Sequence, residues 1–286
     1  MKNNKSNKSK TDIFIKIENG RIFACSNDAK GSVCGYFSSL ERLREQLDEM
    51  GQGHMHGVCL LLPDDFHCCE LIRLPAMSQR AMQANVRARA LTLHKEGEIL
   101  DAYPVSESNG ECCVLVSVLS CQKLDAVKAQ LTRNGFLLCR IIPSALASLA
   151  FIQRHCHGLR GKTYGALLVH GEELDVVLAL KGRYAASITV SPMPSDLDGA
   201  VIQSTVNKLA KASFSELCPK EPVQWVLIGG GGIQPRVRDI DKASDTQVKG
   251  SVFDIPSKYR GYVERGLAPD MIYAIESDRE QINAVI

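Results

Sequence analysis

A nearly continuous apolar run ends in a cluster of glycines in residues 223–235, VQWVLIGGGGIQP. A run of this length, interrupted only by Gln224, predicts a strand buried on both faces, as in the interior of an α/β sheet. Because glycine has no Cβ, the turn that follows can take positive φ and let a ligand approach the main chain. The pattern is typical of a nucleotide-binding turn, but without a GxGxxG spacing or a P-loop lysine it is equally typical of a tight connection. The residues of this turn are Gly229, Gly230, Gly231 and Gly232.

Charge and cysteine usage exclude several classes of protein. The 286 residues carry 34 basic and 32 acidic side chains, so no broad basic surface is expected and we predict no nucleic-acid partner. The 11 cysteines are spread along apolar runs without a recognisable signal peptide, which favours buried free thiols in a reducing cytosol. No stretch reaches the ~18 to 20 apolar residues of a membrane helix, so we predict no direct membrane insertion.

The first residues of the chain predict a tail followed by a small α/β unit. Residues 1–11 are rich in Lys, Asn and Ser and are predicted to be a disordered tail. Isoleucines then alternate with other residues on both sides of Asn19-Gly20, which predicts a β-hairpin. Residues 38–50 have leucines at helical spacing, with Ser38 or Ser39 as the cap, and residues 58–62 predict a further strand.

Residues 64–135 predict a compact unit of their own. The order is strand, helix, strand, strand, helix, and a strand at 136–142 follows, which indicates a small two-layer α/β module. An apolar stripe on its first helix is expected to face the core of this module rather than a partner. The stripe consists of Met82, Val86, Ala90 and Leu93; the expected elements are 69–74, 78–94, 99–105, 112–119 and 120–135.

The second half begins as the first half does. After a helix from Ser144 to about residue 157, residues 158–162 are predicted to be a domain boundary. A new set of strands then follows at 164–170, 174–180 and 184–190. A long helix at 194–217, a strand near 252–255 and a short helix near 259–265 complete the expected elements. The pattern leaves open whether residues 270–286 dock on the body or trail from it.

Two passages resemble PilM, the actin-like component of type IV pilus assembly, and its GspL-like relatives in type II secretion. They are LIRLPAMSQRAMQANVRARA at 71–90 and VLVSVLSCQKLDAVKAQLTRNGFLLCRIIPSALASLAF at 114–151. The resemblance implies an α/β fold of the actin-like ATPase class, FtsA/PilM-type, with two related α/β domains and an inserted small α/β subdomain. It implies a first domain of 12–63 and 136–160, the insertion at 64–135, and a second domain at 161–286.

The resemblance also implies an ATP site, but two of its carboxylates are missing. Active members of the superfamily carry an Asp-x-Gly turn in each opening hairpin, where the carboxylate holds Mg²⁺ at the phosphates. Here Lys16 and Val169 stand at the Asp positions, and Glu18 stands at the first Gly position, whereas Gly171 is kept. Lys16 can attract a phosphate but cannot ligate magnesium. We therefore expect at most ATP binding, by Lys16, Gly171 and the glycine turn, without efficient hydrolysis and without a catalytic residue.

Other chemistry has weaker support in the sequence. His54, His56 and Cys59 are plausible metal ligands at close spacing, but they lack the paired CxxC or HExxH arrangement of a closed site. Turn histidines and packed thiols are the simpler interpretation, and we predict no metal site.

Two functions remain open. The first is a cytoplasmic scaffold of a type IV pilus or type II secretion-like platform. It would be peripheral to the inner membrane through a partner, binding the cytoplasmic tail of a PilN-like single-pass protein together with other platform proteins. The second is an ATPase, a nucleotide-dependent switch or a small-molecule kinase on the same fold. The missing carboxylates at Lys16 and Val169 favour the scaffold.

Overall fold

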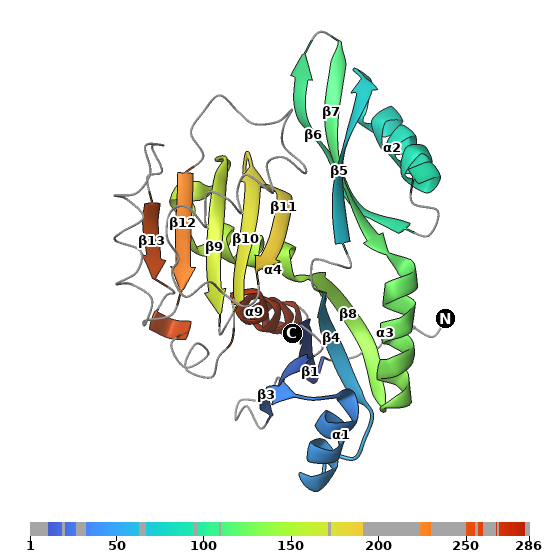
Figure 1. Ribbon diagram of the computed structural model, residues 1–286, viewed down its shortest axis with the longest axis vertical. Helices are drawn as coiled ribbons and strands as arrows, with labels where there is room; N and C mark the ends of the chain where they lie inside the picture. Colours follow the sequence, from blue (N-terminus) through green and yellow to red (C-terminus); the bar gives the residue numbers. More distant parts are fainter. Residues whose placement is uncertain are drawn as a thin grey trace.

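The computed structural model contains two five-stranded sheets and one three-stranded sheet (Figure 1). It describes residues 11–18, 21–26, 33–62, 67–93, 97–108, 110–170, 173–190, 224–229, 250–254, 257–259, 267 and 269–283. The predicted tail, the Asn19-Gly20 turn and the predicted helix at 194–217 lie outside these residues. The predicted helix near 259–265 lies almost wholly outside them, and Ser257–Tyr259 is a short 3-10 helix, η4.

Sheet 1 has the strand order β3-β2-β1-β4-β8. The predicted hairpin is confirmed by the antiparallel pairing of β1 with β2, in which Ile13 lies opposite Ser26. β4 and β8 continue the sheet in parallel. Strand β3 was not predicted, since a four-residue strand is too short to show a period. The bounds are β1 Ile13–Glu18, β2 Arg21–Ser26, β3 Cys34–Phe37, β4 His56–Leu62 and β8 Phe136–Pro143.

Sheet 2 repeats this topology in the order β11-β10-β9-β12-β13. Three antiparallel strands are again followed by two parallel strands, and β12 lies inside the sheet between β9 and β13. The similarity predicted between the two halves is therefore confirmed at the level of strand order. The bounds are β9 Tyr164–His170, β10 Glu173–Leu180, β11 Arg183–Val190, β12 Gln224–Gly229 and β13 Gly250–Asp254.

The inserted module forms a third sheet, in the order β5-β7-β6, with helix α2 on one side (Figure 1). Met82 and Val86 of α2 pack on β5 and β7 in a core of the module's own, as the apolar stripe predicted. Side chains of Ala90 and Leu93 lie outside the described part of the chain. The bounds are β5 His67–Pro75, α2 Gln79–Leu93, β6 Gly97–Ser108 and β7 Glu111–Ser120.

Helices α1 and α3 cover one face of sheet 1. α1 spans Leu40–Glu49, and Ser39 caps it by accepting a 3.3 Å hydrogen bond from the Arg42 amide. α3 spans Cys121–Arg133 and ends at Gly135, whose φ of 75° few other residues adopt without strain. Although α3 lies within the predicted insertion, its buried residues Leu124, Val127 and Leu131 belong to the core of sheet 1.

Helices α4 and α9 join the two halves. α4, Ser144–His155, follows the last strand of sheet 1, and its residues Ala145, Leu149 and Ile152 pack against sheet 2. α9, Pro269–Asn283, follows the last strand of sheet 2 and packs against sheet 1 and α4 (Figure 1). The C-terminal segment thus docks on the body, and α9 contributes to the core of sheet 1 although the predicted second domain was 161–286. Among the helices that the structure describes, none is both long and apolar enough to span a bilayer.

Candidate functional site

A buried cluster of three charged side chains lies where the two halves meet. Lys16 of β1 is 4% exposed, and its Nζ lies 3.0 Å from Oδ2 of Asp270 and 3.9 Å from Oδ2 of Asp175. The side chains of Asp270 and Asp175 are 1% and 13% exposed. We call Lys16, Asp175 and Asp270 the interdomain ion cluster. It connects sheet 1, sheet 2 and the N-terminus of α9.

The alternation of β1 explains why Lys16 lies there. Ile13 and Ile15 face α1 and α3, whereas Phe14 faces α9, so Lys16 is directed to the α9 side of the sheet. Asp270 occupies the first turn of α9, where the unpaired amides and the helix dipole stabilise a carboxylate, and its Oδ1 accepts a 2.7 Å hydrogen bond from the Met271 amide.

Asp175 reaches the cluster from the second half. It lies on β10 opposite Leu168 of β9, and its Oδ1 accepts a 2.6 Å hydrogen bond from Thr189 Oγ1 on β11. The sequence offered no role for Asp175 or Asp270. Asp175 interrupts the apolar run 174–180, and this was the one available signal that its side chain has a special role. The residues around Asp270 give no indication that it pairs with Lys16.

The ion cluster limits what Lys16 can bind. A buried ammonium that already faces two carboxylates has its charge compensated, so a phosphate would have to displace Asp270 before it could reach Nζ. The same ion pairs engage both carboxylates, so neither could coordinate a magnesium ion without losing its contact with Lys16. The cluster therefore resembles a structural ion-pair network, in which the ammonium on β1 is paired with carboxylates on β10 and α9.

The glycine turn begins at the end of an inner strand, as predicted. Gly229 is the last residue of β12, and it pairs with Val169 of β9 and with Asp254 of β13. β9 and β12 are parallel, so the predicted Asp position at Val169 and the first glycine of the predicted turn, Gly229, lie at the same edge of sheet 2. Gly230, Gly231, Gly232 and Gly171 lie outside the described residues, and their role in holding ATP stays a prediction.

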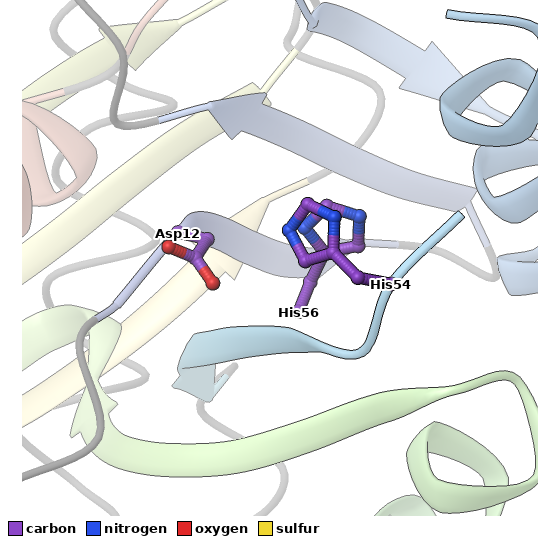
Figure 2. Close-up of side chains that lie close together, drawn as sticks. All are labelled: Asp12, His54 and His56. Atoms are coloured by element: carbon purple, nitrogen blue, oxygen red, sulfur yellow. The ribbon is translucent and has the colours of Figure 1, made fainter. Parts of the chain in front are cut away.

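The histidines considered for metal binding are partly brought together. His54 and His56 lie beside each other with ring centroids 4.2 Å apart, and Asp12 joins them (Figure 2). Cys59 is buried on the other side of sheet 1 with Phe14 and Phe23, so it is not part of this group.

Comparison with known proteins identifies the fold. Neither a protein-family model nor a curated protein matches the sequence. A chain of the solved PilM-PilN type IV pilus biogenesis complex superimposes with a TM-score of 0.62 at 13% identity, over 95% of this chain and 99% of that one. The cytoplasmic domain of EpsL, an inner-membrane component of the type II secretion system of Vibrio cholerae, gives a TM-score of 0.49 at 13% identity, over 88% and 93% of the two chains.

A third solved structure, a protein of unknown function with an actin-like ATPase fold from Bacteroides thetaiotaomicron, gives a TM-score of 0.43 at 11% identity, over 96% and 99% of the two chains. The likeness to the PilM-PilN structure shows that this chain has the predicted fold, that of the actin-like ATPases, at low sequence identity.

Proposed function

We propose that this chain is a scaffold of a type IV pilus or type II secretion-like assembly platform, and that it binds a cytoplasmic peptide of a PilN-like membrane protein. The observation that carries the proposal is the likeness to the PilM-PilN structure, which extends over 95% of the chain. In this proposal the protein reaches the cytoplasmic face of the inner membrane through that partner.

The edge strand β8 of sheet 1 supports peptide binding. β8 is the last strand of sheet 1 in the described part of the chain, and Leu137 on it is 47% exposed. An extended peptide adds to such an edge through main-chain hydrogen bonds and places alternate side chains in neighbouring pockets. α3 leads from the module into β8, and Leu137 lies near the start of β8, beside Gly57 of β4.

The interdomain ion cluster supports the scaffold over the ATPase. Hydrolysis of ATP needs Mg²⁺ held near the phosphates, whereas Asp175 and Asp270 are both within ion-pair distance of Lys16. In the proposed function the two halves are held together by these internal charges, and nucleotide turnover is not required for assembly.

The test is the binding of a labelled peptide, the cytoplasmic tail of the PilN-like protein of the same organism, measured by fluorescence anisotropy. Leu137→Lys should weaken binding at least about tenfold, because it places a charge at the proposed strand edge. Met50→Lys is the matched control, since Met50 is 40% exposed at the end of α1, and it should leave binding unchanged.

Two results would contradict the proposal. The first is the absence of saturable binding by the unmodified chain, and the second is equal affinity of both variants. A steady ATP turnover that is lost on Gly230→Asp would instead support the alternative of an ATPase or nucleotide-dependent switch.

A further inference from the structure

Asp12, His54 and His56 form a group of potential metal ligands at one end of sheet 1 (Figure 2). His56 is the first residue of β4, His54 lies in the loop before it, and Asp12 immediately precedes β1. One ligand atom from each side chain lies within 4.8 Å of the other two. β1 and β4 are parallel, so the group sits where both strands begin, away from the strand ends that carry the predicted ATP site.

Backbone contacts fix two of the three side chains. The Asp12 amide donates to the Gly57 carbonyl at 2.8 Å, and the Gly57 amide donates to Oδ2 of Asp12 at 3.0 Å. In the described part of the chain no hydrogen bond reaches Oδ1 of Asp12, so this oxygen can take another ligand. His56 is 2% exposed, and its Nε2 lies 2.8 Å from the Gln52 carbonyl oxygen. A carbonyl can only accept, so Nε2 carries a proton, and in the neutral ring Nδ1 keeps a lone pair.

The contact of His56 with Gln52 is the kind that orients metal-binding histidines. Such a histidine usually donates its second ring N–H to a carbonyl or carboxylate, which sets its tautomer and ring orientation. A side chain of α1 also holds the loop that carries His54. Arg44 of α1 donates to the carbonyls of Gly53 and His54 at 2.6 and 2.9 Å, and it pairs with Asp48 at 2.9 Å. His54 therefore projects from a fixed backbone while its own side chain is exposed.

We propose that Asp12, His54 and His56 bind a zinc ion. Two imidazoles and one carboxylate are a ligand set for Zn²⁺ or a similar late transition metal and not for Mg²⁺ or Ca²⁺, which take oxygen ligands. Tetrahedral ligands at ~2.0 to 2.1 Å from zinc lie about 3.3 to 3.4 Å apart. The exposed His54 ring must therefore rotate toward the other two, which its position in the loop allows. A water molecule completes the fourth position.

The simpler interpretation is a packed histidine pair without a metal. The two rings are tilted by 43° at 4.2 Å, and His56 also lies 6.4 Å from the Phe136 ring. Ring packing accounts for these contacts, and the Gly57 amide holds Oδ2 of Asp12, but neither uses Oδ1 of Asp12. Zinc binding accounts for all three side chains, and it does not depend on the proposed scaffold function.

The test uses the full chain without a polyhistidine tag, stripped of metal with EDTA and then dialysed. Titration with zinc chloride in a calorimeter should show one ion bound per chain, and zinc should raise the thermal unfolding midpoint. Magnesium chloride should do neither. His54→Ala removes an exposed ligand with little risk to the fold and should weaken zinc binding at least about tenfold.

Asp12→Asn tests the second ligand, because its amide oxygen can still accept from Gly57. This variant should also lose affinity while its unfolding midpoint without zinc stays close to that of the unmodified chain. His157→Ala is the matched control, since His157 is an exposed histidine away from the group, in the 3-10 helix His157–Leu159. Absence of saturable zinc binding would overturn the proposal, as would equal zinc affinity of His54→Ala and His157→Ala.

Discussion

The ammonium of Lys16 is buried where the two halves of the molecule meet. A charge at 4% exposure is tolerated only when it is compensated, and here Asp270 and Asp175 supply the opposite charges from two other elements. At the residue scale, Lys16 stands where the resemblance predicted a metal-binding carboxylate, and Asp175 and Asp270 balance its positive charge.

Replacing Lys16 alone should be strongly destabilising. Lys16→Met leaves two carboxylates without their cation, and removal of one partner from a buried pair costs about 3 to 5 kcal/mol. The double variant Lys16→Met/Asp270→Leu should cost less than the sum of the two single variants, because it removes both charges. Urea unfolding followed by circular dichroism measures each free energy of unfolding.

The matched control is Lys128→Met, which breaks the exposed pair with Asp125 at 3.3 Å. This pair lies on the solvent side of α3, and its loss should change the free energy of unfolding by less than about 1 kcal/mol. If Lys16→Met were as mild as Lys128→Met, the interdomain ion cluster would have no structural role.

Binding of ATP, if present, should be nearly independent of Mg²⁺. Asp175 and Asp270 are held by Lys16, and Val169 supplies no carboxylate. Calorimetric titration with ATP in the presence of Mg²⁺ and then of EDTA compares the two affinities directly. A gain of about tenfold from Mg²⁺ would show that a carboxylate does reach the metal and that the hairpins have been matched wrongly to the superfamily pattern.

At the scale of elements, α9 is held to α4 by a polar network as well as by apolar packing. Tyr259 is 2% exposed, and its hydroxyl donates to Oε1 of Glu276 at 2.6 Å and lies 3.1 Å from Nε2 of His155. Burial lowers the pKa of His155, and Lys258, Arg154 and His157 lower it further, while Glu276 opposes them. Above its ordinary pKa of about 6.5, His155 is therefore neutral in this network, and its contact with Tyr259 is a hydrogen bond between neutral groups.

This network predicts a loss of stability in acid. The unfolded chain protonates His155 near its ordinary pKa of about 6.5, whereas the folded chain protonates it only at lower pH. The stabilisation is thus complete above about pH 6.5 and declines as the pH falls toward the lower folded pKa. His155→Gln should flatten this decline in unfolding midpoints measured from about pH 7.5 to 5.5, whereas His157→Gln, which removes only the smallest contribution to the lowered pKa, should flatten it much less. Equal slopes in all three proteins would contradict the assignment.

The module should be removable only if α3 is kept. His67 at the start of β5 pairs with Leu119 at the end of β7, so the chain enters and leaves the three-stranded sheet at neighbouring points. Deleting 67–118 and joining the ends with a short Gly-Ser linker should give a folded protein. Deleting 64–135 also removes Leu124, Val127 and Leu131 from the core of sheet 1 and should give an aggregated one. Circular dichroism and size-exclusion chromatography separate the two outcomes, and a soluble, cooperative 64–135 deletion would contradict the packing described for α3.

Most helices and strands could be predicted because their signals are local. The alternating isoleucines of β1, the Ser39 cap of α1 and the Gly135 stop after α3 each act over a few neighbouring residues. The packing partners of α3 and α9 could not be predicted, since they depend on residues far away in the chain. For the same reason the ion cluster was missed: Lys16 was recognised from its position in the hairpin, but Asp175 and Asp270 become its neighbours only after folding.

At the scale of the whole molecule, the two halves exchange helices. α4 extends from sheet 1 to pack on sheet 2, and α9 extends from sheet 2 to pack on sheet 1. Phe151 of α4 also contacts the α9 cluster, so the two helices share one core. Each half therefore uses a helix of the other half to cover one face of its sheet. A boundary near residue 160 divides the two sheets along the chain, but the hydrophobic cores contain residues from both sides of it.

The halves should consequently not fold alone. In an isolated 161–286 fragment, α9 would expose Met271, Ile272 and Ile275, each of which is at most 1% exposed in the whole chain. Burial of such side chains contributes about 1.5 to 3 kcal/mol each, a sum comparable with the total stability of a typical domain, about 5 to 15 kcal/mol. The fragments 1–160 and 161–286 should each lack a cooperative unfolding transition and should regain it when co-expressed as a complex.

The whole chain should unfold in a single transition. Fluorescence of its single tryptophan, Trp225, and far-ultraviolet circular dichroism should give the same urea midpoint for that transition. Separate transitions, or a cooperative 161–286 fragment, would mean that the exchanged helices add little to either half.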